Sequence, residues 1–175
     1  MPRTQQARAA AAATLLACAL LTGLAGCGSD GGGPRHVGTV LDSTDDEGGR
    51  YRQIPKKDAP EIGVVVQPDA APPGGWDIRI RIRHFRLTPK GTPAHAVHGR
   101  GYVQLYLDGH RLARLRTTDH RLPATRVTRG THHVTARLYA DDHTVWAVDG
   151  EPLEATADLT ASGAETDPPT GQGLG

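Results

Sequence analysis

Cysteine is nearly absent from this chain, which has only Cys18 and Cys27 in its 175 residues. Both lie in the first thirty residues, so the remainder can form no disulfide and no thiolate metal site. Serine is absent between Ser43 and Ser162. These absences exclude serine and cysteine nucleophiles from the central part of the chain.

Other catalytic and binding patterns are also missing. No glycine-rich phosphate loop or dinucleotide-binding fingerprint is present. The acidic residues of the central region fall mainly in turns and do not form the opposed carboxylate pair that a glycosidase needs. The chain has 20 basic and 19 acidic residues, and this near-neutral balance argues against nucleic acid as a partner. We therefore predict that the protein is not an enzyme; catalysis would require an unrecognised metal site.

The first residues have the pattern of an export signal. Arg3 and Arg8 provide positive charge, and an apolar run follows over Ala9 to Leu21. The run is shorter than the roughly 20 residues that cross a bilayer as a helix. A plain secretory signal with a chance cysteine would explain these features.

The end of this segment, Leu24-Ala25-Gly26-Cys27, resembles the lipobox of bacterial lipoproteins. The resemblance implies that Cys27 receives a diacylglyceryl group and becomes the first mature residue. Acyl chains such as palmitate then anchor the protein, since two chains hold it stably where one does not. The resemblance also implies that the protein is located at the cell membrane, on its extracytoplasmic face.

Composition divides the chain into four segments. Residues 1–26 are the signal peptide, and residues 27–60, rich in Gly, Asp and Ser, are predicted to be a flexible linker. Residues 61–160 are predicted to form one small domain. Residues 161–175 lack an apolar pattern and are predicted to be a disordered tail. We expect a monomer.

Within the predicted domain, apolar and polar residues alternate, which is typical of half-buried strands. In Gly75 to Arg83, Trp76 and three isoleucines face one side and three arginines face the other. The apolar parity then changes, which predicts a bulge near His84. Asp-Gly pairs at residues 108–109 and 149–150 predict hairpin turns. The pattern favours an all-β fold, an antiparallel Ig-like sandwich of about seven strands.

The motifs GWDIRIRIRHFRLTP, GYVQLYLDG, RGTHHVTARL, ADDH and AVDGEPLEA occur in this order over nearly the whole domain. They resemble a family of secreted bacterial Ig-like domains of largely unassigned function. That family carries a G-H-x-H-L-Y-V-D-G strand, whose two histidines suggest a copper or zinc site. Here the two positions are Tyr102 and Gln104, and His143 keeps the imidazole of the family's A-N-D-H segment. The resemblance implies that the site has been lost here or was never metallic.

Two groups of side chains remain as candidate ligand sites. The first is a candidate ligand face, made of Tyr102, Gln104 and the arginine stripe Arg79, Arg81 and Arg83. The stripe could contact an anionic envelope polymer or lipid headgroup, although a solvated strand face is the plainer interpretation. The second group is His95, His98 and His143, which could hold copper or zinc with further donors. A turn-stabilising role for His143 and solvated loop histidines are the plainer alternatives.

The sequence thus predicts a lipid-anchored, extracytoplasmic binding or interaction module without a cofactor. Its partner would be an envelope protein or polymer, in addition to the membrane that holds the anchor. The alternative is a metal-handling lipoprotein that uses copper or zinc.

Overall fold

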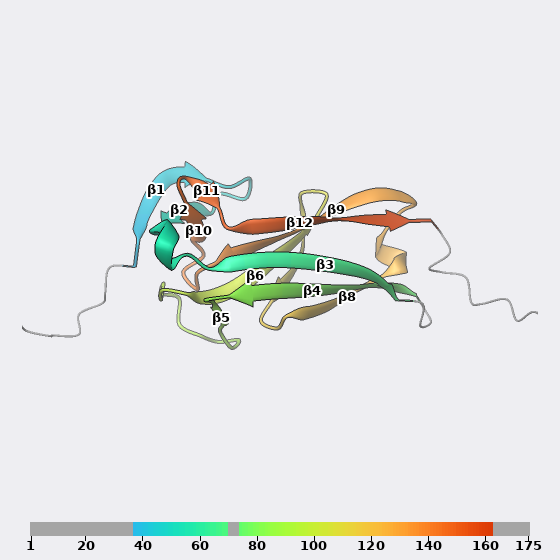
Figure 1. Cartoon of the computed structure of the whole chain (residues 1–175), viewed down its shortest axis with the longest axis horizontal. Helices are drawn as coiled ribbons and strands as arrows, with labels where there is room; N and C mark the ends of the chain where they lie inside the picture. The colour runs from blue at the N-terminus through green and yellow to red at the C-terminus, as the bar shows by residue number, and fades with distance from the viewer. Residues whose placement is uncertain (1–36, 70–73, 163–175) are drawn as a thin grey trace, which may run out of the picture. The chain divides into compact units, whose positions relative to one another are not determined.

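The computed structural model describes residues 37–69 and 74–162, which form an all-β fold (Figure 1). The predicted signal peptide, Cys27 and the tail beyond Ser162 lie outside these residues. None of the helices in the described ranges is long and apolar enough to cross a membrane.

The described residues contain twelve strands and two 3-10 helices. The elements in chain order are β1 Thr39–Thr44, β2 Arg50–Gln53, η1 Lys56–Asp58, β3 Glu61–Asp69, β4 Gly75–Arg83, β5 Arg86–Leu87, β6 Arg100–Leu107, β7 His110–Leu115, β8 Asp119–Pro123, η2 Ala124–Arg126, β9 Gly130–Tyr139, β10 Val145–Val148, β11 Glu151–Pro152 and β12 Glu154–Ala161.

These strands form two sheets. In the small sheet, β4 lies between β3 and β8. In the large sheet, β9 pairs with β6 on one side and with β12 and β10 on the other; β7 and β5 continue from β6, and β2 and β1 continue from β10. The β3 strand contacts β9 and β12, so the small sheet packs against the large one (Figure 1).

One hydrophobic core lies between the two sheets. Strand β4 contributes Trp76, Ile78 and Ile80, each at most 2% exposed, while its arginines face outward. The β6 strand contributes Val103 and Leu105, which are fully buried. Alternation along these strands therefore places the apolar rows in the core, as the sequence predicts.

The arrangement is more complex than an antiparallel sandwich of about seven strands. Two strand pairs are parallel, β2 with β10 and β5 with β6. Both involve short strands whose sequences have no strong alternation. The all-β prediction is confirmed, but the expectation of purely antiparallel pairing is wrong. The short strands β2 and β5 pair in parallel with strands that are distant in the sequence or separated by a long loop, and no hairpin turn sets their direction.

The linker predicted for residues 27–60 differs from the structure in its second half. Residues 39–44 and 50–53 form β1 and β2, and β2 pairs with β10. The first part of the predicted linker, up to residue 36, lies outside the described residues. At the other end, β12 extends to Ala161, the first residue of the predicted tail.

The bulge predicted near His84 is instead a break between β4 and β5. His84 has φ 55°, a left-handed conformation that few non-glycine residues adopt, and the chain then moves to the large sheet. Both predicted Asp-Gly turns are confirmed, because Asp108 and Asp149 have φ near 50° and each following glycine also has positive φ.

Candidate functional site

The face of β6 that points away from the hydrophobic core is also buried, although its residues are polar or amphipathic. Tyr102, Gln104 and Tyr106 are 2%, 2% and 4% exposed. The loop between β1 and β2, together with long side chains of β7 and β9, covers this face of the large sheet. All four tyrosines of the protein gather here, with Tyr51 packed against Tyr102 and Tyr139.

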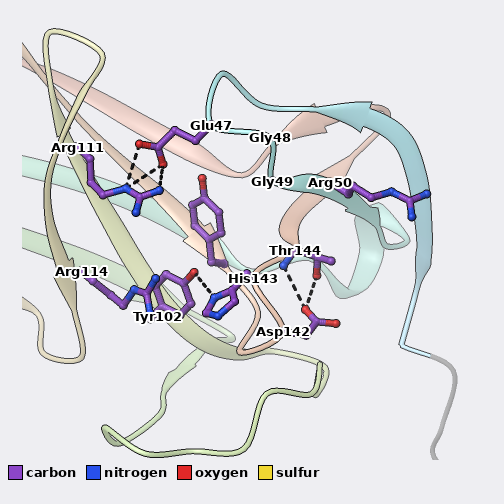
Figure 2. Close-up of a pocket in the computed structure, with 11 residues that line it drawn as sticks. Glu47, Gly48, Gly49, Arg50, Tyr102, Arg111, Arg114, Asp142, His143 and Thr144 are labelled. Carbon is purple, nitrogen blue, oxygen red and sulfur yellow. Dashed lines mark hydrogen bonds and ion pairs between the residues drawn. The ribbon is translucent and has the colours of Figure 1, made fainter.

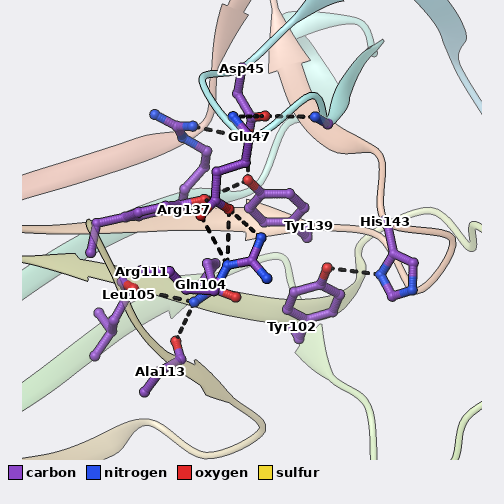
Figure 3. A network of polar contacts seen from close by, with 12 residues as sticks. Asp45, Glu47, Tyr102, Gln104, Leu105, Arg111, Ala113, Arg137, Tyr139 and His143 are labelled. Carbon is purple, nitrogen blue, oxygen red and sulfur yellow. Dashed lines mark hydrogen bonds and ion pairs between the residues drawn. The ribbon is translucent and has the colours of Figure 1, made fainter. Parts of the chain in front are cut away.

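Asp45, in the β1–β2 loop, anchors the loop to the sheet (Figure 3). Its carboxylate accepts hydrogen bonds from the Tyr139 hydroxyl, from Arg137 at 3.1 Å, and from the backbone N–H of Glu47 and Gly49. Its side chain is fully buried. A buried carboxylate with this many donors is well compensated, so the loop has a fixed position.

Glu47 forms the second anchor of the same loop. Its carboxylate oxygens lie 2.5–3.1 Å from the guanidinium nitrogens of Arg111 in β7. One of them accepts a hydrogen bond of 3.0 Å from the Tyr106 hydroxyl. The Tyr106 and Tyr139 hydroxyls lie 2.6 Å apart, so the two anchors are adjacent. No buried side-chain polar atom in the described residues lacks a partner.

The pKa values follow this network. Burial raises the pKa of Asp45, but the hydrogen bonds from Tyr139, the loop backbone and Arg137 outweigh it, so the pKa lies below its usual value. Burial, above all, raises the pKa of Tyr106 to about 12 and raises that of Tyr139 further. The hydroxyls therefore keep their protons at neutral pH.

The close approach of β6 and β9 at Gly101 places Tyr102 at the edge of this network. Gly101 has φ 147°, and a Cβ atom there would overlap the carbonyl oxygen of Tyr139. The Tyr102 and Tyr139 rings stack with centroids 5.3 Å apart. The guanidinium carbons of Arg114 and Arg116 lie 4.4 and 4.9 Å from the Tyr102 centroid.

A buried cluster fixes the neighbouring β9–β10 turn. Arg116 pairs with Asp141 at 2.6 Å, and the Thr88 hydroxyl lies 2.8 Å from the same carboxylate oxygen. Asp142 accepts hydrogen bonds from Thr144 at 2.7 Å and from Arg52 at 2.6 Å. The turn is thereby tied to β2, to the segment after β7 and to the segment after β5.

A pocket of about 450 Å³ opens between these elements (Figure 2). Its walls come from the β1–β2 loop, the start of β2, β6, β7, the end of β9 and the β9–β10 turn. The lining residues are Glu47, Gly48, Gly49, Arg50, Tyr102, Arg111, Arg114, Tyr139, Asp142, His143 and Thr144.

His143 is held in this pocket by an unusual backbone conformation. Its φ is 69°, which places a non-glycine residue in the left-handed region, and such conformations concentrate at functional sites. The Nδ1 atom lies 3.0 Å from the Tyr102 hydroxyl (Figure 2). His143 is thus both the turn residue that the sequence predicts and a polar wall of the pocket.

The residues of the candidate ligand face are separated in the structure. Tyr102 lines the pocket, whereas the amide of Gln104 is buried and donates to the Ala113 carbonyl at 2.8 Å. Arg79, Arg81 and Arg83 lie on the outer face of the other sheet. Arg79 pairs with Asp119 at 3.2 Å and Arg83 with Glu61 at 3.7 Å, so acidic neighbours partly offset the charge of the stripe.

The candidate metal histidines also have separate contacts. His98 packs edge-on against the ring of Trp146, with centroids 6.1 Å apart, while His143 contacts Tyr102. His95 lies in the exposed segment between β5 and β6. Over the described ranges, no group of three or more His, Cys, Asp or Glu side chains has the arrangement of a metal site.

Two other histidines, His120 and His132, lie in strands away from the pocket. In β9, His132 bonds to Asp108 at 2.6 Å and to the Thr128 carbonyl at 2.9 Å. His120 lies in β8. Burial, and then the charge of Arg126, lower its pKa.

Sequence reasoning missed most of the pocket. Arg111 and Arg114 belong to a strand that was predicted, but nothing in the spacing distinguishes them from solvated strand residues. Asp45 and Glu47 fall in a segment with the composition of a linker. The sequence singles out two of the lining residues, Tyr102 in the β6 motif and His143 in the Asp-Asp-His turn.

Comparison of the chain with models of known protein families, with curated protein sequences and with solved structures gives no match.

Proposed function

We propose that this protein is a lipid-anchored, non-catalytic binding module on the extracytoplasmic face of the membrane. It binds a small ligand in the pocket between the β1–β2 loop, β7 and the β9–β10 turn. The observation that carries this proposal is the pocket itself, whose polar walls are held in place by the Asp45 and Glu47 anchors. Its volume lies within the roughly 300–1,000 Å³ of small-molecule sites.

The absence of serine and cysteine from the central part of the sequence supports binding in preference to catalysis. Serine does not occur between Ser43 and Ser162. The two carboxylates at the pocket, Glu47 and Asp142, are both occupied by arginine and hydroxyl donors. A carboxylate held in this way is a poor general base, because its partners favour the ionised form.

We also infer that the fold is an elaborated Ig-like domain. Two facing sheets with one core, hairpin turns at Asp-Gly pairs and mostly antiparallel pairing support this relationship. The short strands β1, β2 and β5 would then be additions at the ends of the large sheet.

The lipid anchor is tested by labelling cells with a radioactive or clickable fatty acid. The wild-type protein should incorporate the label and fractionate with membranes, and Cys27→Ala should lose both properties. Cys18→Ala is the matched control and should keep them. Unchanged labelling of Cys27→Ala would exclude this anchor.

Ligand binding is tested on the purified full chain with four classes of small polar probe: carboxylates, inorganic phosphate, amines and neutral sugars. At least one class should bind, and amide chemical shifts should change at Tyr102, Arg114 and Thr144. No binding by any class, or changes confined to the Arg79–Arg83 face, would refute the pocket as the binding site.

A further inference from the structure

We propose that the pocket recognises a small polar molecule through a carboxylate group, and that Arg114 is the residue that pairs with it. This inference rests on the proposed binding function and specifies its ligand class. It follows from the net charge of the residues at the pocket, from their available hydrogen-bond donors and from the polarity of the lining side chains.

Arg114 is the arginine of the pocket lining that has no ion-pair partner among the described residues, so it can pair with a ligand. Its guanidinium group lies over the Tyr102 ring at 4.4 Å (Figure 2), and within the described residues no hydrogen bond or ion pair engages it. The contact with the ring holds the guanidinium group at the pocket and uses its charge rather than its N–H donors. A planar fork of donors matches the two oxygens of a carboxylate.

The other charges at the pocket are already paired. Glu47 pairs with Arg111, Asp142 with Arg52, and Arg50 with Asp42. One unit of positive charge therefore remains, at Arg114. A monoanion neutralises it, whereas a phosphate, with roughly −1.5 to −2 charges near pH 7, would leave excess negative charge beside two carboxylates.

The Tyr102–His143 pair adds a donor next to this charge. If the Tyr102 hydroxyl donates to Nδ1 of His143, the Nε2–H of the ring is available. If Nδ1–H donates to the tyrosine oxygen, the hydroxyl proton is available instead. Either tautomer leaves one donor that can bind an acceptor, as an anionic ligand requires.

The walls favour a hydroxylated ligand over a hydrocarbon one. Apart from the two tyrosine rings, the pocket is lined by charged residues, His143, Thr144 and the backbone of two glycines. An acyl chain would leave these groups without water or partners, which costs free energy. A small sugar acid or amino acid has the matching polarity.

The test is calorimetric titration of the purified full chain near pH 7 and at low salt. The carboxylate probes are acetate, glutamate and D-glucuronate; inorganic phosphate, glucosamine and glucose represent the other classes. Glucose is the neutral counterpart of glucuronate. At least one carboxylate should bind, and more tightly than phosphate, glucosamine or glucose.

Variants then test the role of Arg114. Arg114→Gln should weaken carboxylate binding about tenfold or more, because a charged hydrogen-bonding partner is lost. Tyr102→Phe should weaken it less. Arg81→Gln is the matched control: Arg81 is an exposed strand arginine of the small sheet, outside the pocket, and its loss should leave affinity unchanged.

The outcomes separate this inference from the proposed function. Tighter binding of phosphate, glucose or glucosamine than of every carboxylate would refute the ligand class and leave a binding pocket. Carboxylate binding that Arg114→Gln does not change would refute the role of Arg114. If no probe binds, both the inference and the binding function fail.

Discussion

Asp45 is the residue on which the polar side of the large sheet depends most. It joins a loop near the start of the described chain to Tyr139, 94 positions later, and to Arg137. Because its side chain is fully buried, each of its hydrogen bonds replaces contact with water. Single residues of this kind determine whether the loop stays in place and whether the pocket keeps its shape.

Asp45→Ala should lower the free energy of unfolding by about 3 kcal/mol, because the Tyr139 hydroxyl and two loop N–H groups lose their acceptor and Arg137 keeps only Glu154 as an ion-pair partner. Asp158→Ala is the control, since Asp158 pairs with His133 at an exposed site where both side chains are more than 60% exposed. That change should cost about 0.5 kcal/mol or less. Urea denaturation measures both, and equal effects would contradict the assigned role of Asp45.

His132 should give the fold a pH dependence. The hydrogen bond to Asp108, followed by the bond to the Thr128 carbonyl, raises the pKa of His132 above its ordinary value of 6.5. Protonated His132 therefore stabilises the fold fully below that value, and the stabilisation is lost as pH rises through the raised pKa. Wild type should lose stability relative to His132→Gln when pH rises from about 6 to about 8.

The wild-type protein must be compared with His132→Gln because His120 changes the pH dependence of stability in the opposite direction. Burial lowers its pKa, so its contribution to stability falls as pH decreases. Subtracting the His132→Gln profile from the wild-type profile removes this opposing effect. His133→Gln is the matched control, since it leaves the Asp108–His132 bond in place, and its profile should keep the wild-type slope.

At the scale of elements, the sequence predicts the long strands well and the short ones poorly. In β4, β6 and β9, apolar residues alternate with polar ones, and the Asp-Gly turns fix the hairpins. Strands β1 and β2 read TVLDST and RYRQ, which have little alternation. Their position comes from pairing with β10 and from Asp45, contacts that local sequence does not encode.

The difference between local sequence patterns and long-range contacts also explains which pocket residues the sequence could predict. Tyr102 and His143 are conspicuous because they lie in motifs with a recognisable pattern. The role proposed for Arg114 depends on the ion pairs that its neighbours form, Arg111 with Glu47 and Arg116 with Asp141. That partition of charges is a property of the folded structure, so no spacing rule reveals it.

The β1–β2 hairpin should be an integral part of the folded domain. A chain that starts at Glu61 lacks the hairpin and exposes Tyr102, Tyr106 and Tyr139, which the hairpin loop and β2 help to bury. We expect it to lose cooperative urea unfolding or to aggregate. A chain that starts at Val37 is the control and should unfold cooperatively. Equal midpoints for the two chains would show that the hairpin is dispensable.

On the scale of the whole molecule, the two sheets share a single hydrophobic core. Residues of β4 and β8 from the small sheet lie in the same cluster as residues of β6, β9, β10 and β12 from the large one. Neither sheet can bury its apolar face without the other, so separating them would expose both faces to water. The molecule should therefore unfold as one unit.

The two tryptophans of the protein allow a direct test, because each sheet contains one. Trp76 lies in β4 and Trp146 in β10, and both are at most 2% exposed. In Trp76→Phe and Trp146→Phe, fluorescence reports on the remaining tryptophan and circular dichroism on all strands. In each variant the fluorescence and dichroism midpoints in urea should coincide, as two-state unfolding requires. The variants will differ from each other in stability, so the comparison is made within each protein. A fluorescence midpoint displaced from the dichroism midpoint in either variant would mean that one sheet unfolds independently, and the single shared core would then not be the cooperative unit.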